Sequence, residues 1–575
     1  MDQNSLVKTY HGINVSKGVA LGKVFVYSPF VPIIDNAKIS EDKVEEEISK
    51  FKLGQSRAVK EIEDIVDKLT KAHDKKADIF VAHKMLILDP DMEEEIINSI
   101  KNKNSASKSI DEVIKKYKDM MLLNECECIR DKAYDLSDIE NRILRCILGF
   151  EEINLADIKE PVIVVTHDLT PSDTATLNKE MIKGIITEVG GQTSHSAIIA
   201  RSYDIPAVLG VTDILKHVKN GDKIILDALK GDVILNYDEN LYKDFEKKQK
   251  CYLVELADIK KYLDKEPITK DGTNISVNLN LASTKIEDLK NAKYVDGCGL
   301  FRTEFIFMGK QTLPTEDEQF EIYKKVLLSF KGRVTIRTLD IGGDKKLDCM
   351  ELPKEDNPFL GERALRLCLN HLDIFKTQLK AIFRASIYGK LNVMFPMVGT
   401  MDDVTNAYKV VDEVKKELDA KKIKYSKDIK VGIMIEIPSI GLISDIVSKE
   451  VDFASIGTND LCQYSLAVDR LNPNVSKYYQ MYNPGVLRLI NYIVTSFNNN
   501  KKIVSVCGEM GGNPITAAIL IGFGMRTLSM SASNLACVKK MIINNSIEDL
   551  EKISKKVLTL KTNDEIKDYV TKHLK

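Results

Sequence analysis

The chain has 575 residues, of which 44% are hydrophobic, enough apolar side chains for the cores of three or four domains. Its 83 basic and 85 acidic residues leave a formal charge of -2 without a concentrated basic stretch, which argues against nucleic acid as a partner. No run approaches the roughly 18 to 20 apolar residues of a membrane span, so we expect no membrane insertion and a cytoplasmic location. Ten scattered cysteines indicate reduced thiols rather than a disulfide framework.

The N-terminal quarter of the chain changes from short strands to a helical pattern. Residues 11–27 have the short apolar runs and turns that are typical of β-strands. From Val44 to Leu69 apolar residues recur at steps of three and four, the period of a long amphipathic helix. Further helical patterns follow over 77–88, 92–101, 110–123 and 137–148. We therefore predict a small helical bundle over residues 39–150.

Strand-like segments return after Pro161. Short apolar runs lie at 161–165, 184–188, 207–211, 223–226 and 233–235. Together with the N-terminal strands they predict one β/α domain, formed by residues 1–38 and 151–237, into which the helical bundle is inserted. A polar helical pattern then runs from Asn240 to Leu263, so we expect a linker helix over residues 238–268.

Strand and helix patterns alternate through the rest of the chain. The eight strand candidates are 275–281, 299–307, 334–341, 391–397, 431–437, 453–457, 503–507 and 527–530. Eight such units over about 300 residues have the size and rhythm of a (β/α)8 barrel. We predict this barrel for residues 269–575, with its active site at the C-terminal ends of the strands.

A histidine stands at a predicted helix N-terminus in the β/α domain. His195 follows Gly190-Gly191 and precedes an apolar run with helical spacing. A helix N-terminus presents unpaired N–H groups and about half a positive charge, which favour a bound phosphoryl group. His195 is thus a candidate phosphate carrier. On this segment alone, a polar residue in a first helical turn is an equally good interpretation.

Polar side chains end or follow several predicted barrel strands. Arg302 and Glu304 interrupt the second strand, and the others follow in chain order: Arg337 and Asp340 in the third, Glu436 in the fifth, Asn459 and Asp460 after the sixth, and Cys507 and Glu509 at the seventh. A single charge of this kind is commonly a buried ion pair that supports the barrel. A whole set converging on one rim instead indicates a functional site.

The residue types on this rim favour phosphoryl transfer. Glu436 and Asp460 are hard oxygen ligands of the kind that Mg²⁺ prefers. Four arginines supply forked donors for carboxylate and phosphate: Arg302, Arg337, Arg363 and Arg470. One metal with several arginines implies a small, strongly anionic substrate, whose phosphate a neutral His195 imidazole could attack.

Seven motifs carry a resemblance to a known family over nearly the whole chain. They cover residues 16–23 (SKGVALGK), 83–90 (HKMLILDP), 168–172 (DLTPS), 301–305 (FRTEF), 337–345 (RTLDIGGDK), 456–461 (IGTNDL) and 506–510 (VCGEM). The chain resembles the enzyme I family of the phosphoenolpyruvate-dependent sugar phosphotransferase system. The resemblance implies an α/β multidomain fold, in which a swivelling phosphohistidine domain carries an inserted HPr-binding helical subdomain and precedes a (β/α)8 TIM barrel that forms a homodimer. Because no sensor domain precedes His11, we expect the sugar branch of the family.

The resemblance also implies a role for each site residue. His195 accepts the phosphoryl group of phosphoenolpyruvate and passes it to the carrier HPr, and Thr170 hydrogen-bonds this histidine. Glu436 and Asp460 bind Mg²⁺, and the substrate is held by Arg302, Arg337, Asn459 and Arg470, with Arg363 and Lys345 close by. Cys507 protonates the enolate carbon to give pyruvate, a role that fits a thiol, whose pKa can be tuned toward neutrality.

Of three other functions that similar modules perform, two stay open as alternatives. Phosphoenolpyruvate synthases and pyruvate phosphate dikinases share these modules but need a nucleotide-binding domain, for which the chain has no Walker motif. A Mg²⁺-dependent lyase that acts on phosphoenolpyruvate or pyruvate would use the same kind of barrel but leaves His195 without a task. The chain could also be a non-catalytic regulator whose phosphorylation is recognised by a partner.

Overall fold

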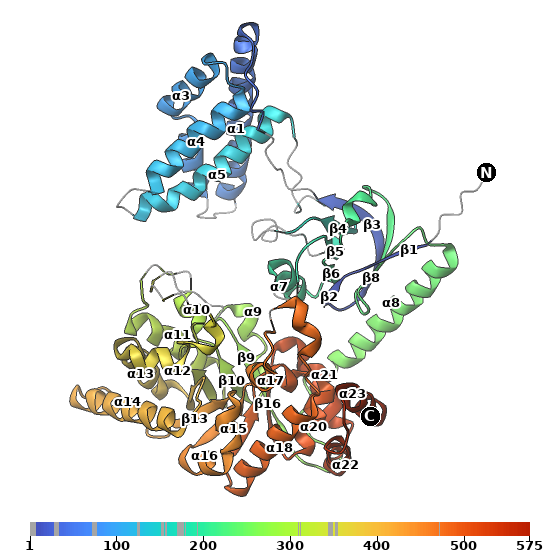
Figure 1. The fold of residues 1–575 in the computed structure, drawn as a ribbon, viewed down its shortest axis with the longest axis vertical. Helices are drawn as coiled ribbons and strands as arrows, with labels where there is room; N and C mark the ends of the chain where they lie inside the picture. Colours follow the sequence, from blue (N-terminus) through green and yellow to red (C-terminus); the bar gives the residue numbers. More distant parts are fainter. Residues whose placement is uncertain are drawn as a thin grey trace. The chain divides into compact units, whose positions relative to one another are not determined.

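The chain forms two compact units, Met1–Leu253 and Val254–Lys575 (Figure 1). The computed structural model describes residues 7–27, 34–71, 77–122, 127–150, 155, 158–169, 178, 180–191, 194–308, 310, 312–342, 349–350, 353, 355–470 and 472–575. Thr170 and Lys345 lie outside these residues, and His195 is described in its backbone only. None of the described helices combines the length and the apolar character needed to cross a membrane.

The first unit contains an eight-stranded mixed sheet in the order β1-β8-β7-β3-β4-β5-β6-β2. Its strands are β1 Lys8–His11, β2 Ile13–Ser16, β3 Val19–Tyr27, β4 Val162–Thr166, β5 Ile182–Thr187, β6 Ala207–Leu209, β7 Lys223–Asp227 and β8 Asp232–Leu235. The centre, β3-β4-β5-β6, is parallel, and both edges are antiparallel. The predicted apolar runs are therefore the strands of one sheet.

Both faces of this sheet are buried. Along β4, Val162 and Val164 join one core, whereas Ile163 and Val165 join another on the opposite face, as the two-residue period of a strand requires. The first core includes Ala197 and Ala200 of helix α7, His195–Ser202. The sheet thus fixes the position of the short helix that begins at His195.

Five helices follow β3 in the chain and share one core. They are α1 Val44–Lys71, α2 Ala77–Ile87, α3 Pro90–Lys101, α4 Ala106–Leu122 and α5 Glu127–Leu148. The Asp89 carboxylate caps α3 by accepting hydrogen bonds from the N–H groups of Asp91 and Met92, each at 3.0 Å, and Pro90 occupies the first turn. The periodicity of the sequence predicted all five helices.

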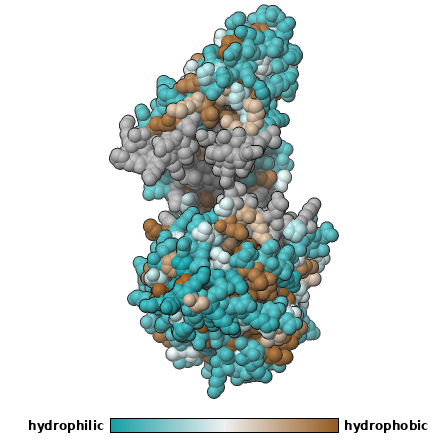
Figure 2. All heavy atoms as spheres, turned by 90° about the vertical axis from the view of Figure 1, so that its left-hand side faces the viewer, coloured by the Kyte–Doolittle hydropathy of each residue, from teal (hydrophilic) through white to brown (hydrophobic). Residues whose placement is uncertain are grey.

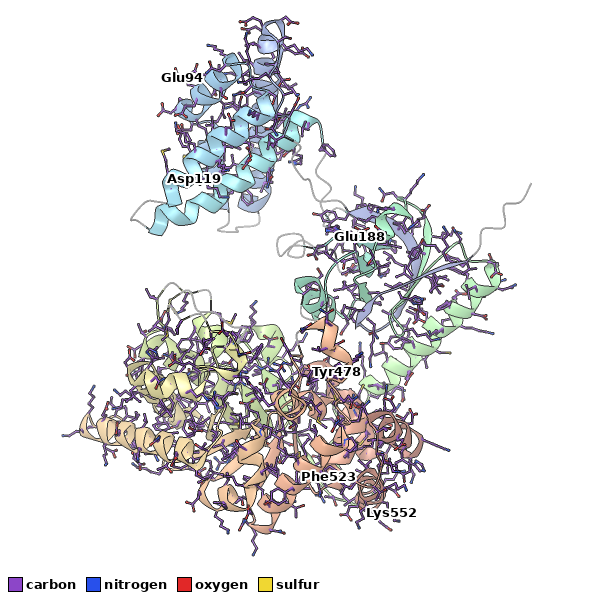
Figure 3. All side chains as sticks on the ribbon, in the orientation of Figure 1. Glu94, Asp119, Glu188, Tyr478, Phe523 and Lys552 are labelled. Atoms are coloured by element: carbon purple, nitrogen blue, oxygen red, sulfur yellow. The ribbon has the colours of Figure 1, made fainter. Side chains whose placement is uncertain are left out.

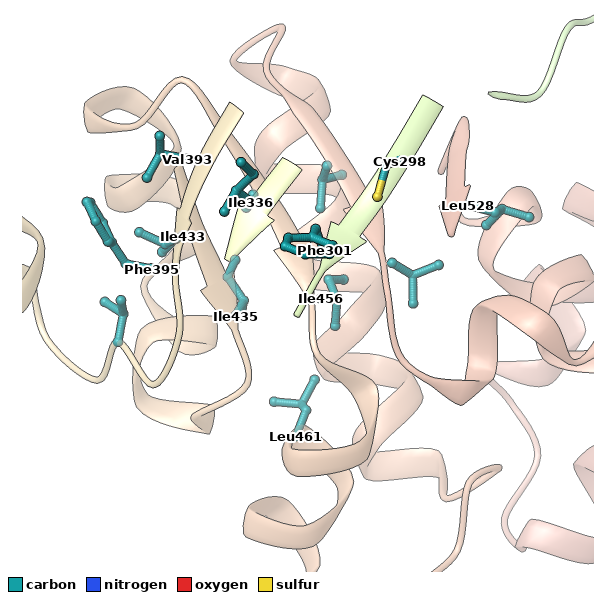
Figure 4. Packing of buried hydrophobic residues seen from close by; sticks show 14 of the residues in the cluster. Cys298, Phe301, Ile336, Val393, Phe395, Ile433, Ile435, Ile456, Leu461 and Leu528 are labelled. Carbon is teal, nitrogen blue, oxygen red and sulfur yellow. The ribbon is translucent and has the colours of Figure 1, made fainter. Parts of the chain in front are cut away.

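The second unit contains a closed barrel of eight parallel strands, in which β9 pairs with both β10 and β16. The strands are β9 Ser276–Leu281, β10 Gly297–Phe301, β11 Val334–Arg337, β12 Leu391–Phe395, β13 Lys430–Ile435, β14 Phe453–Ile456, β15 Ile503–Val506 and β16 Thr527–Met530. Residues such as Phe301, Ile336 and Ile456 pack between the strands and the surrounding helices (Figure 4). The predicted (β/α)8 barrel is confirmed.

Helices connect and surround the barrel strands. The longer ones are α11 Glu316–Ser329, α13 Leu372–Ala385, α14 Met401–Ala420, α17 Thr458–Leu466, α18 Pro484–Asn499, α20 Pro514–Gly522, α21 Leu535–Ile543, α22 Ile547–Val557 and α23 Asn563–His573. Short helices are α9 Ile286–Leu289, α10 Glu304–Phe307, α12 Leu365–Asn370, α15 Pro438–Leu442, α16 Ser444–Glu450 and α19 Glu509–Gly512. Helix α8, Glu239–Lys260, contributes to both compact units. On the face in Figure 2 hydrophilic side chains cover most of the surface, with hydrophobic ones in separate groups.

Two predicted strands extend well beyond the observed ones. The second ends at Phe301 rather than residue 307, because the chain turns into α10, where the Ile306 N–H donates to the Thr303 carbonyl at 3.0 Å. Arg302 and Glu304 therefore follow the strand and do not interrupt it. The third ends at Arg337, so Asp340 lies in the following loop. Short apolar runs such as Phe305-Ile306-Phe307 do not distinguish a strand from a helical turn.

The helical bundle contains a pair of carboxyl groups whose charge should make its stability depend on pH. Burial, then the hydrogen bond and charge of Asp111, raise the pKa of Glu140 from its ordinary 4.5 to about 7. Between these values the folded bundle binds the proton more tightly than the unfolded chain, so its stability should fall as pH rises through this window. The Glu140→Gln variant cannot ionise and should be the more stable form at about pH 8.

Amide hydrogen exchange of α4 and α5, corrected for the intrinsic exchange rate, measures this difference in the full chain. Asp119→Asn is the control, because it removes an exposed carboxylate from α4, the helix that carries Asp111 (Figure 3). The explanation is wrong if wild type and Glu140→Gln lose protection equally between about pH 5 and pH 8.

Candidate active site

The predicted rim residues lie at one end of the barrel. Arg302 follows β10, Arg337 ends β11, Glu436 follows β13 and Cys507 follows β15. Asn459 and Asp460 lie in the first turn of α17, directly after β14. Because all eight strands are parallel, their carboxyl ends meet at a single rim.

Arg363 connects two of the acidic groups on this rim. It is only 2% exposed, and its Nε and Nη2 donate to the two oxygens of Asp340 at 3.0 and 3.3 Å. Nη2 also lies 3.1 Å from Oδ2 of Asp460, and Nη1 donates to the Tyr464 hydroxyl at 3.2 Å. The planar guanidinium therefore fixes Asp460 relative to the loop after β11. A lysine ammonium lacks the forked donors that bond both oxygens of Asp340 and also Asp460 at the same time.

Arg337 makes a second buried set of ion pairs. Its Nη2 pairs with Glu304 and lies 2.9 Å from Oδ2 of Asp340. Burial alone would lower the pKa of Arg337, but the surrounding carboxylates, Asp340 foremost, raise it above its ordinary value. The guanidinium is thus permanently charged. Its Nε is buried and has no hydrogen-bond partner among the residues that the structure describes.

Glu436 and Asp460 are forced close to other negative charges. The Glu436 side chain is buried, and its Oε1 accepts a hydrogen bond from the Met397 N–H at 2.7 Å. Burial, followed by the charges of Asp460 and Asp340, raises the pKa of Glu436 to about 8. Gly457 allows this approach, because a Cβ there would lie 2.7 Å from Oε2 of Glu436. The acidic pair therefore favours an additional positive charge.

The remaining predicted substrate residues that the structure describes lie on the same rim. Nη2 of Arg470 lies 3.5 Å from Oδ1 of Asp460, an oxygen that accepts no hydrogen bond from the described residues. Oδ1 of Asn459 accepts from the Glu509 N–H at 3.0 Å, which fixes the orientation of the amide. Arg302 has an exposed side chain, and its charge acts on Cys507. The structure thus brings together the predicted rim residues that it describes.

Cys507 has a buried thiol on the same rim. Burial raises its pKa to about 11, although Ser455 and the charges of Arg337 and Arg302 lower it in part. The thiol is therefore not tuned toward neutrality, because the small apolar cluster that surrounds it, with Leu300, Met394 and Met434, disfavours the thiolate. At neutral pH it holds its proton and is suited to act as an acid rather than a nucleophile.

In the first unit the backbone confirms a helix that begins at His195. Ser194 is its N-cap, with a hydroxyl that accepts from the Ala197 N–H at 3.3 Å. The Ser196 hydroxyl donates to Oδ1 of Asp168 at 2.9 Å, which joins the first turn to the segment before Thr170. The imidazole of His195 and the whole of Thr170 lie outside the described residues, so their predicted contact stays a prediction.

Sequence reasoning missed two neutral residues of the site. Tyr464 bonds Arg363 and donates to the Phe359 carbonyl at 2.6 Å, and Gln378 bonds two rim segments from helix α13. The charged residues at strand ends have a recognisable pattern, whereas a neutral polar residue within a helix has none. For Tyr464 the sequence does contain a signal, because residues four apart, such as Asp460 and Tyr464, lie on the same face of a helix.

Arg363 is the residue whose loss should most affect the stability of this site. Arg363→Met removes the charge and keeps most of the stem, which leaves Asp340 and Asp460 without their common partner. We expect the free energy of barrel unfolding in urea to fall by about 3 to 5 kcal/mol at neutral pH. The loss should shrink at about pH 5, because protonation then removes the uncompensated charges.

Arg366→Met is the matched control. Arg366 is exposed and donates only to the carbonyls of Leu360 and Gly361 among the described residues, so its loss should cost less than about 1 kcal/mol. Equal losses for the two variants would contradict the bridging role of Arg363.

The chain matches known proteins along nearly its whole length. Residues 257–547 match the PEP-binding domain of the PEP-utilising enzymes, residues 158–231 their mobile domain and residues 11–131 their N-terminal domain. The phosphoenolpyruvate-protein phosphotransferase of Priestia megaterium is 41% identical over 570 residues, which are 98% of this chain and 99% of that protein. Proteins with the same name are 41% identical in Bacillus subtilis (strain 168), over 98% of this chain and 99% of the relative, and 40% identical in Staphylococcus aureus (strain Mu50), over 99% and 100%. The chain belongs to the phosphoenolpyruvate-protein phosphotransferases, the enzyme I family of the phosphotransferase system.

Proposed function

We propose that this enzyme transfers the phosphoryl group of phosphoenolpyruvate to its own His195 and then to a histidine of the carrier HPr, and releases pyruvate as the first step of sugar uptake. The observation that carries the proposal is the rim of the barrel, where Arg337 and Arg363 are buried among carboxylates beside a protonated thiol. The helix that begins at His195 supplies the acceptor in the other unit.

The substrate is a small molecule with a carboxylate and a phosphate. Arg302, Arg337, Asn459 and Arg470 would hold these groups, because guanidinium forks and an amide match their oxygens. Lys345, from the motif that follows β11, would complete the set. Phosphoenolpyruvate is the anion for which the family is named, and it fits this donor set.

The rim also fits Mg²⁺, which Glu436 and Asp460 would bind. Four buried carboxylates, Glu304, Asp340, Glu436 and Asp460, surround only two buried guanidinium groups, so the buried charge would be negative by two with all four ionised, an excess that raises the pKa of Glu436. A divalent cation balances this excess and would polarise the phosphoryl oxygens when bound. Waters and substrate oxygens would fill the other positions, because Mg²⁺ usually keeps several waters and is bound through one or two carboxylates together with substrate phosphates.

The protein's own groups account for the bonds that change. The P–O bond of phosphoenolpyruvate breaks as a P–N bond to the neutral His195 imidazole forms. The departing enolate takes a proton at its methylene carbon from Cys507, which gives pyruvate, and the resulting thiolate then recovers a proton from water. A pKa of about 11 keeps the proton on Cys507 until the enolate forms.

The helical bundle has a surface suited to the carrier. Val81, Met85 and Leu88 are exposed at helical spacing along and just after α2, and Met85 is 70% exposed. An exposed apolar stripe of this kind is typical of a protein contact. We assign this stripe to HPr. The proposal also assigns homodimerisation to the barrel and the reaction to the cytoplasm, as the sequence resemblance implies.

Label transfer from phosphoenolpyruvate tests the central step. With Mg²⁺ and labelled phosphoenolpyruvate, wild type should take up label that is lost in acid and kept in base, and should pass it to HPr. His195→Ala should take up none, because no other imidazole begins this helix. His167→Ala is the control, since His167 is exposed in the same unit and pairs with Glu188 at 3.0 Å.

Two results would contradict the proposal. Carbon–carbon cleavage of the substrate without label on the protein would favour the lyase. No turnover and no label would favour the non-catalytic regulator.

Met85→Asp tests the carrier surface separately. A charge in the apolar stripe should slow transfer from the phosphorylated enzyme to HPr by at least about tenfold, the effect of a central contact residue. Autophosphorylation by phosphoenolpyruvate should stay unchanged, because the stripe is remote in sequence from both reacting groups. Rapid-quench measurement of the two steps distinguishes them.

Met120→Asp is the control for this variant, because Met120 is an exposed methionine on α4 of the same bundle. If Met120→Asp slows the transfer as much as Met85→Asp, the stripe is not the docking surface.

A further inference from the structure

Gln378 is a fully buried amide behind the rim. It lies on α13, outside the barrel wall, and no part of its side chain reaches solvent. Its Oε1 accepts a hydrogen bond from the Leu339 N–H at 2.9 Å, and its Nε2 donates to the hydroxyls of Thr303 and Tyr323, both at 3.2 Å. The backbone donor at Leu339 fixes which end of the amide is the oxygen. Both N–H donors of the amide and one of the two lone pairs of its oxygen are therefore used in hydrogen bonds.

These contacts reach two different segments of the rim. Thr303 stands between Arg302 and Glu304, and Leu339 stands between Arg337 and Asp340. The Thr303 hydroxyl also donates to the Arg337 carbonyl at 2.9 Å, so the two segments are joined directly as well as through Gln378. One neutral side chain thus sets the relative position of two arginines that we assign to the substrate.

The amide is itself held from the other side. The Tyr323 hydroxyl donates to Oε1 of Gln319 at 3.0 Å, and the Gln319 amide donates to the Pro314 carbonyl at 3.0 Å. Tyr323, Gln319 and Thr303 are each at most 1% exposed. A buried network in which each member is satisfied is rigid, because any displacement leaves a polar group without a partner.

We propose that Gln378 is a positioning residue for phosphoryl transfer, which holds Arg302 and Arg337 at the separation that the carboxylate and phosphate of the substrate require. This inference rests on the proposed function. Gln378 is not one of the residues that we assign to the substrate, and it acts through Thr303 and Leu339. The precise placement of charged donors matters because a shift of about 1 Å can cost on the order of a hundredfold in rate.

Gln378→Met tests the proposal, since methionine has a similar shape and no hydrogen-bonding amide. We expect the rate of autophosphorylation at saturating phosphoenolpyruvate to fall by about tenfold to a hundredfold, with a smaller change in KM. The arginines still attract the anion in this variant, but they no longer align it for transfer.

Gln319→Met is the matched control at the far end of the same network. It removes a buried amide that bonds Tyr323 and the Pro314 carbonyl and no rim residue among those described. We expect a similar loss in thermal stability and a rate within about threefold of wild type, because rim segments keep their bonds to Gln378. If Gln319→Met loses as much rate as Gln378→Met, the role is structural and the inference is wrong.

Gln378→Glu keeps the experiment decisive if the methionine variant does not fold. A buried glutamic acid offers a donor to Thr303 only when it is protonated, and its oxygen can still accept from Leu339. The rate of this variant relative to wild type should therefore rise as pH falls. A ratio that is independent of pH would overturn the proposal. If wild type itself forms no phosphorylated protein in the same assay, the proposed function fails instead.

Discussion

The bridge that Arg363 makes between Asp340 and Asp460 is the constraint on which the rest of the rim depends. Burying several carboxylates in one place is unfavourable unless positive charge is buried with them, and breaking such a set leaves an uncompensated charge. Arg337 and Arg363 supply part of this charge and share Asp340 as a common partner. These two arginines do not balance every carboxylate. Burial, and then the charges of Asp460 and Asp340, therefore raise the pKa of Glu436. Because the negative charge of the rim is not fully balanced by its own arginines, the rim is suited to bind a metal ion together with its substrate.

Both compact units are needed for the chemistry. One supplies the substrate-binding groups and the other supplies the histidine, and each group stands at the end of a strand or at the start of a helix. The barrel presents its groups from strand ends, whose positions the closed ladder of hydrogen bonds fixes. The other unit presents His195 at the start of α7, whose alanines pack into the core beneath the sheet. Helix α8 contributes to both units, as expected for the segment that connects a swivelling domain to its barrel.

Much of this organisation could be predicted from the residues. The eight barrel strands are short apolar runs separated by helical periods, and the charged residues that follow them were assigned to the correct rim. The strand ends were less predictable, because tertiary contacts help to determine them. The Leu339 N–H, just after β11, bonds to Gln378 on α13, which lies 39 residues further along the chain. The raised pKa of Cys507 could not be predicted for a related reason, since its apolar neighbours come from four other strands. Periodicity carries no information about such contacts.

Phosphorus NMR of the protein during reaction with phosphoenolpyruvate and Mg²⁺ tests the central claim most directly. We expect the phosphoenolpyruvate signal to fall while a phosphoimidazole signal on the protein rises, with one pyruvate formed for each protein-bound phosphoryl group. Pyruvate formed together with inorganic phosphate alone, without a phosphorus–nitrogen signal on the protein, would contradict it.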